Sequence, residues 1–92
     1  MVKVGKYNYE KSTRPDKKLM VKVDNKTIHF GDAKNKAEHY KDKTGIWKHL
    51  DHGDKKRREA YQARSKGIKN KEGELTYKDP KSSNFHSLRI LW

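Results

Sequence analysis

The sequence contains no cysteine and few apolar residues. Disulfide bonds and thiolate metal ligands are therefore excluded, and packing and hydrogen bonds must hold the fold together. Only 30% of the 92 residues are apolar, against roughly 45–50% in typical globular domains on a slightly different residue set. No apolar run approaches the roughly 18 residues of a membrane span, and the N-terminal MVKVGKYNYEK lacks the apolar centre of a signal peptide. We expect no membrane partner and an intracellular location.

A composition this polar leans towards disorder, yet two Trp, five Tyr and two Phe are spread along the chain. The apolar residues also cluster in short patterned segments instead of being scattered. We therefore expect one small basic domain over residues 1–92, with a thin core and marginal stability.

Positive charge dominates the sequence, with 24 Lys and Arg against 12 Asp and Glu and a net charge of +12. Such a field attracts polyanions, most commonly nucleic acid, and after it anionic membrane surfaces and acidic protein faces. Lysine greatly outnumbers arginine, which favours contact with phosphates over the reading of bases. An AT-rich coding genome would produce the same balance, because lysine codons are AT-rich.

Alternation of apolar residues predicts an antiparallel sheet within about residues 7–30. Leu19, Val21 and Val23 occupy every second position, and DNK at 24–26 supplies a turn before the next strand. The segment YNYEKS alternates in the same way, and STRPDK connects it to the second strand. We expect an α+β fold in which a three-stranded antiparallel sheet packs with two to three short helices.

The helical part is predicted over about residues 33–68. Asp32 is placed to cap a short first helix with Ala33, Ala37 and Tyr40 at helical spacing. Residues 69–82 are polar and are expected to form a loop, with a short extended piece around Leu75 and Tyr77. Residues 83–92 form an apolar C-terminal segment, which we expect to dock on the sheet as a helix or a final strand.

The stretch HLDHGDKKRREAYQAR, residues 49–64, contains the best helix signal. The pattern predicts a helix from about Lys55 to Ser65, with Asp54 as the N-cap and Gly67 as the stop. Its first turn carries four cations, which the helix dipole opposes by about 0.3–1 kcal/mol each. Cations beside free helix amides favour an anion, so phosphate is the expected ligand.

Two faces are predicted for this helix. Arg57 and Arg64 flank Tyr61 at helical spacing and are expected to pack inwards, and Phe30 and Trp92 are expected in the core. The aromatic residues Trp47, Tyr40, Tyr77 and Trp92 would suit base stacking, but core positions are the more ordinary role. The outward, nucleic-acid-binding face is predicted to comprise Lys55, Lys56, Arg58 and Lys66, together with Lys41, Lys43 and Lys48 of the preceding segment.

A metal-dependent nuclease is a third hypothesis for the same stretch, and it is the only enzyme hypothesis. The candidate metal ligands are His49, Asp51, His52 and His29. The signal is weak, because no HExxH pattern occurs and surface or loop histidines are more common. We therefore expect no metal, no other cofactor and no catalytic residue.

Five segments follow one another along the chain: STRPDKKLMVKV, HFGDAK, HYKDKTG, HLDHGDKKRREAYQARSKGI and DPKSSNFHSLRILW. Together they resemble a family of small, uncharacterised proteins of large double-stranded DNA viruses and some phages. Some members have a single His-x-Asp where this chain has HLDHGD. Of the two histidines in HLDHGD, only His52 is matched to the histidine of that motif. The matching residues are His29, Phe30 and Gly31; His52, Asp54, Arg57, Arg58, Tyr61 and Arg64; and Ser87, Leu91 and Trp92.

The resemblance implies a viral origin and names no activity. The leading hypothesis is a viral nucleic-acid-binding or genome-associated virion protein, located in the virion or the host-cell interior, that binds phosphates of double-stranded DNA largely without sequence specificity. The alternative is a minor capsid or other structural virion protein that binds acidic protein surfaces.

Overall fold

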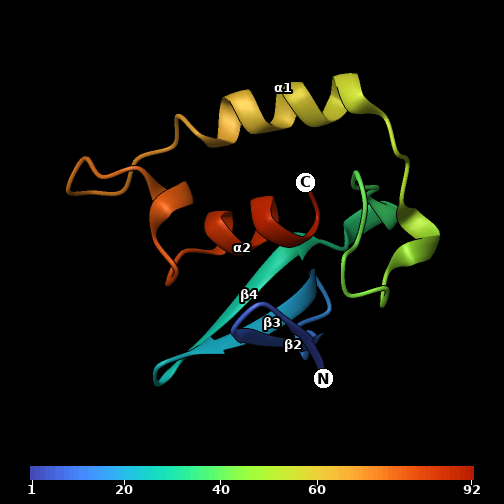
Figure 1. Cartoon of the computed structure of the whole chain (residues 1–92), viewed down its shortest axis with the longest axis horizontal. Helices are drawn as coiled ribbons and strands as arrows, with labels where there is room; N and C mark the ends of the chain where they lie inside the picture. Colours follow the sequence, from blue (N-terminus) through green and yellow to red (C-terminus); the bar gives the residue numbers. More distant parts are fainter.

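A computed structural model describes residues 1–92 and shows one antiparallel sheet and two helices (Figure 1). The α+β class is confirmed, but the expectation of three strands within about residues 7–30 was one strand short. The missed strand has only three residues, too few for alternation to be visible in the sequence. In sheet order the strands are β1 (Val2–Val4), β2 (Tyr7–Lys11), β3 (Lys17–Val23) and β4 (Lys26–Asp32).

The predicted alternation sets the register of the sheet. Tyr9, Val21 and Ile28 lie side by side on three neighbouring strands, and all three are buried. Two residues further along, Leu19 pairs with Phe30 on the same face. The apolar residues at every second position therefore form one continuous surface for the core.

The helix predicted from the KKRREA stretch is confirmed as α1 (Lys55–Ser65), and Asp54 caps it. The apolar C-terminal segment forms α2 (Ser83–Ile90), which Ser82 caps. Figure 1 shows α2 between the sheet and α1, so the three elements form successive layers. No helix has the length and apolar character needed to cross a membrane.

The short helix expected from Asp32 to Tyr40 does not form. Only the 3-10 helix η1 (Lys34–Lys36) is present, and Asn35 and Lys36 within it have positive φ angles of 55° and 53°. Ala33 is the N-cap residue of η1, and Asp32 before it accepts a hydrogen bond from the Lys34 amide. Two more 3-10 helices occur in the connecting segments, η2 (Lys48–Leu50) and η3 (Thr76–Lys78).

The core is thin, as the composition predicts: 14 of the 92 residues are buried. Gly31 allows α2 to approach β4 closely, because a Cβ there would lie 2.7 Å from Leu91 Cδ1. Its φ of +79° also lies in the region that favours glycine. The buried apolar residues are Tyr9, Leu19, Val21, Val23, Ile28, Phe30, Ile90 and Leu91.

A buried hydrogen-bond chain crosses this core. The Tyr9 hydroxyl donates to His86 Nδ1 at 2.9 Å, and His86 Nε2 donates to the Pro80 carbonyl at 2.6 Å. Burial raises the pKa of Tyr9 to about 12 and lowers the pKa of His86, so both groups stay neutral near pH 7. The chain joins β2, α2 and the segment before α2 with each of these groups hydrogen-bonded.

Replacing Tyr9 with phenylalanine should lower the free energy of unfolding by about 1–3 kcal/mol, because His86 Nδ1 would stay buried without a donor. Urea denaturation measures the loss. Tyr7→Phe is the matched control, since it removes a hydroxyl from the neighbouring, partly exposed tyrosine. Equal losses in the two variants would contradict the assigned role of the Tyr9–His86 bond.

Candidate nucleic-acid interface

The outer face of α1 is strongly basic and exposed to solvent. Asp54 ends the preceding loop, and Glu59 is the only acidic residue within α1 itself. The exposed cations of α1 and the residue after it are Lys55, Lys56, Arg57, Arg58, Arg64 and Lys66.

The predicted division of α1 into inward and outward residues was wrong for its arginines. Arg57 and Arg64 are exposed, and Arg57 forms an ion pair with Glu38 at 3.6 Å. Arg58 instead packs against the rest of the protein. Its guanidinium lies 5.0 Å from the Tyr40 ring centroid, and its Nε donates to the main-chain oxygen of Trp92 at 2.8 Å.

The reason for this difference is a rotation of the helix by one residue from the predicted face. Tyr61, Gln62 and Ser65 are the least exposed residues of α1, and Arg58 precedes Tyr61 by one turn on the same side. On this same side, Gln62 donates to the main-chain oxygen of Trp92 at 3.0 Å.

The amides at the start of α1 already have an acceptor. Asp54 Oδ1 accepts from the amides of Lys56 at 2.9 Å and Arg57 at 3.3 Å, and the Asp54 amide donates to His52 Nδ1. The helix end therefore offers fewer free amides to an anion than the sequence suggested. A bound phosphate would meet the side-chain ammonium groups instead.

Aromatic stacking attaches α1 to the end of α2. The rings of Tyr61 and Trp92 are stacked, with centroids 4.1 Å apart and an interplanar angle of 7°. His52 lies 5.2 Å from the Trp92 ring, and the Tyr61 hydroxyl hydrogen-bonds to Ser87 Oγ at 3.1 Å. The residues of the His-x-Asp motif and of the terminal Trp motif thus meet in space, where they position α1.

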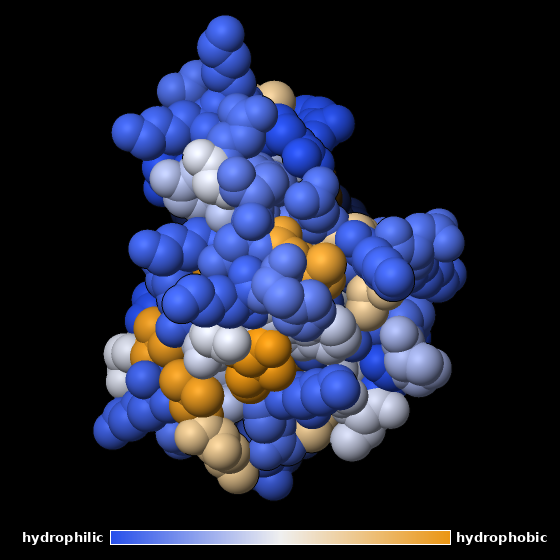
Figure 2. Space-filling view, turned by 90° about the vertical axis from the view of Figure 1, so that its right-hand side faces the viewer, coloured by the Kyte–Doolittle hydropathy of each residue, from blue (hydrophilic) through white to orange (hydrophobic).

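The loop lysines lie beside the same end of α2. Main-chain hydrogen bonds join the amide of Lys41 to the carbonyl of Leu91 and the amide of Lys43 to that of Ile90. Lys41, Lys43 and the η2 residue Lys48 are all exposed. Figure 2 shows this side of the molecule: hydrophilic side chains cover its upper part, where α1 lies, and apolar side chains appear in its middle and lower part.

A buried chain of polar groups holds this loop on the sheet, and no sequence pattern predicted it. Lys18, only 2% exposed, donates from Nζ to the Ala37 carbonyl at 2.6 Å and to His39 Nδ1 at 2.9 Å. His39 Nε2 in turn donates to Asp51 Oδ1 at 2.5 Å. Burial lowers the pKa of both Lys18 and His39. In a lysine-rich sequence, no local pattern distinguishes Lys18 from its exposed neighbours.

The four candidate metal ligands do not converge. His29 on β4 hydrogen-bonds to Ser12 at 2.7 Å, and Asp51 is engaged with His39. His52 packs against Trp92, while the exposed His49 lies beside Trp47. No group of three or more His, Cys, Asp or Glu residues is arranged to hold a metal ion.

Replacing Lys18 with methionine should lower the free energy of unfolding by about 2–4 kcal/mol. The change removes the buried donor of both the Ala37 carbonyl and His39 Nδ1. The neighbouring Lys17→Met is the control, because Lys17 makes no ion pair. Urea denaturation of both variants measures the difference, and equal stabilities would contradict the structural role of Lys18.

Acidification should destabilise the fold. Burial lowers the pKa values of His39, His52 and His86 below the usual 6.5, so the unfolded chain binds protons that the folded chain does not. The contribution of these three histidines to the free energy of unfolding is fully present above about pH 6.5 and is lost as the pH falls through their folded-state pKa values. Urea midpoints between pH 7.5 and pH 5 measure the loss.

His39→Gln should flatten this pH dependence, whereas the exposed control His49→Gln should keep it. A dependence that is unchanged in His39→Gln would show that the loss has another origin.

Comparisons with known proteins give one match. No curated protein matches the chain, and no solved structure matches it. A family model described as "Family of unknown function (DUF5754)" matches residues 7–65. The matched range contains the sheet from β2 onwards, the loop with its buried polar chain and all of α1, while the terminal motif of Ser87, Leu91 and Trp92 lies outside it. The chain belongs to this family of unknown function.

Proposed function

We propose that this protein binds nucleic acid, with double-stranded DNA as the first partner to test, through the exposed face of α1 and the adjoining loop lysines. It contacts phosphates with little sequence preference. As a cellular setting we propose a viral genome-associated protein of the virion or the host-cell interior.

The observation that carries this proposal is that few of the Lys and Arg side chains form ion pairs within the chain. Of its 24 Lys and Arg side chains, only three form ion pairs with a carboxylate: Arg14, Arg57 and Lys81, the last with Asp24. Exposed, unpaired cations on a folded surface are the electrostatic footprint of a phosphate-binding protein.

The shape of α1 supports the same proposal. Its eleven residues form a rod of about 16 Å that lies outside α2, with the sheet on the far side of α2 (Figure 1). Ala60 and Ala63 are exposed between the cations, so small side chains leave room for close approach to a duplex. Arg58 Nε already donates to Trp92 and Arg57 pairs with Glu38, so lysines supply most of the free cations on this face and the adjoining loop.

Affinity for double-stranded DNA should depend steeply on salt. If about five cations neutralise phosphates, the logarithm of the association constant should fall with the logarithm of salt with a slope of about −4.5. Lys55, Lys56 and Lys66 changed together to Glu should reduce this slope by about 3 and weaken binding by at least about 100-fold. Fluorescence anisotropy titrations at several salt concentrations measure both quantities.

The matched control changes Lys3, Lys22 and Lys26 of the sheet to Glu, because it alters the net charge equally on another surface. It should bind more tightly than the α1 variant and keep most of the slope. Equal weakening by the two triple variants would show that net charge, and not α1, determines binding. A wild-type affinity independent of salt would overturn the proposal.

The alternative role as a minor structural virion protein uses the same unpaired charge, with an acidic protein surface as the partner. Co-purification with capsid protein that survives nuclease treatment would favour this alternative. Loss of the association on nuclease treatment would favour nucleic acid.

A further inference from the structure

The outer edge of β4 has no partner. Only β3 lies beside it in the sheet, and no main-chain group of residues 26–32 makes a hydrogen bond outside that pair of strands. The turn between β3 and β4 has two residues, so Val23 and Lys26 form a hydrogen-bonded pair. From this pair onwards, the main-chain groups of successive β4 residues point alternately towards β3 and away from it. The residues whose N–H and C=O groups point away from β3 are Thr27, His29 and Gly31. Free groups of this kind are a template for another strand.

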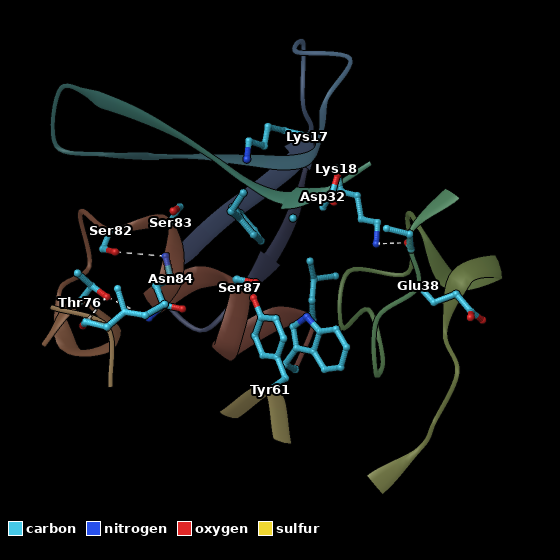
Figure 3. A pocket seen from close by; sticks show the side chains of 16 residues that line it. Lys17, Lys18, Asp32, Glu38, Tyr61, Thr76, Ser82, Ser83, Asn84 and Ser87 are labelled. Atoms are coloured by element: carbon cyan, nitrogen blue, oxygen red, sulfur yellow. Dashed lines mark hydrogen bonds between the residues drawn. The ribbon is translucent and has the colours of Figure 1, made fainter. Parts of the chain in front are cut away.

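A groove of about 570 Å³ lies beside the C-terminal end of this edge. Residues 30–32 of β4 line one side, α2 contributes Asn84 and Ser87, and Tyr61 of α1 lies opposite (Figure 3). The volume lies within the roughly 300–1,000 Å³ of typical ligand sites.

The helix that lines the groove runs along β4. The start of β4 lies near the segment before α2, where Lys81 pairs with Asp24 at 3.6 Å. The end of β4 lies near the end of α2, where Leu91 approaches Gly31. The helix α2 therefore runs alongside β4, and its eight residues span about 12 Å, the length of about four extended residues.

The charge of the groove favours an acidic occupant. Lys17 is half-buried, lines the groove and makes no ion pair, although Asp32 stands opposite it in the ladder. Of the acidic residues in the lining, Glu38 is already paired with Arg57, and Asp32 caps the Lys34 amide. The chain as a whole carries +12, which attracts acidic segments and repels a second copy of itself.

We propose that an extended acidic segment of a partner protein adds to β4 as a fifth strand and places alternate side chains in the groove. Main-chain hydrogen bonds to the β4 edge supply affinity, and Lys17 supplies the preference for an acidic residue. The site is separate from the outer face of α1, so the protein can hold nucleic acid and a protein segment at the same time.

The first test uses wild-type protein and a fluorescein-labelled peptide, Val-Glu-Val-Glu-Val-Glu. Two further versions carry N-methyl groups on odd or on even residues, which leaves the charge unchanged and removes amide donors from one edge. Strand addition predicts that one version binds about tenfold or more weakly than the other, because only one edge faces β4. Equal affinities of the two methylated versions would overturn the proposal.

Variants locate the site. Lys17→Glu should weaken peptide binding about tenfold, while Lys22→Glu, the same change on β3 outside the groove, should have little effect. The triple Glu variant of α1, defective in DNA binding, should keep its peptide affinity. Loss of peptide binding in that variant would show that the peptide competes for the nucleic-acid surface and would overturn a separate site. Should Lys17→Glu fail to fold by circular dichroism, the methylated peptides decide the question with wild-type protein.

Hydrogen exchange gives an independent readout. The amides of Thr27, His29 and Gly31 should exchange rapidly in the free protein and slowly with the peptide bound. If sedimentation shows that the free protein is a dimer with these amides already protected, the occupant is a second copy of the chain and the proposal is wrong.

Discussion

The packing of α2 against the sheet is the interaction on which the rest of the structure depends. Leu91 reaches β4 where Gly31 lacks a side chain, and His86 joins Tyr9 of β2 to the Pro80 carbonyl. The loop after β4 and the helix α1 then attach to the end of α2. The long loop after β4 bonds to the carbonyls of Ile90 and Leu91, and α1 docks through Tyr61 on Trp92. A helix of eight residues thus connects the sheet to both candidate binding surfaces.

Polar side chains take over part of the role of an apolar core. With so few apolar residues, the long loop between β4 and α1 has little hydrophobic surface to bury. It is fixed instead by Lys18 through His39 to Asp51, and by Asp42, whose carboxylate accepts from the amides of Thr44 and Trp47. Buried polar groups that keep their partners give a specific geometry, but each is costly once a partner is lost. The position of the loop, and of the lysines it carries, therefore depends on these polar partners.

The two candidate surfaces lie on opposite sides of α1. Its outer face carries unpaired cations, which suit phosphates on a regular polyanion. Its inner side bounds a groove whose other wall is a strand edge with free main-chain groups, which suits an extended chain. The motif that joins His52, Asp54 and Tyr61 serves both surfaces indirectly, because it sets where α1 lies relative to α2.

Local patterns in the sequence determined the local structure. Alternation at Leu19, Val21 and Val23 predicted the central strands, and Asp54 before a helical pattern predicted the start of α1. The net charge predicted that the surface would be basic. These features depend on neighbours along the chain, and so they can be read from the order of residues alone.

Contacts between distant residues were decided only by the tertiary structure. The burial of Lys18 depends on groups 19 to 33 positions away, and the inward direction of Arg58 depends on Trp92, 34 positions away. The same holds for the failure of the helix after Asp32, where the Ala37 carbonyl and His39 are held by Lys18. The free edge of β4 likewise follows from its place at the end of the sheet. Periodicity shows which face of an element is apolar, but which element covers that face is settled by packing across the whole chain.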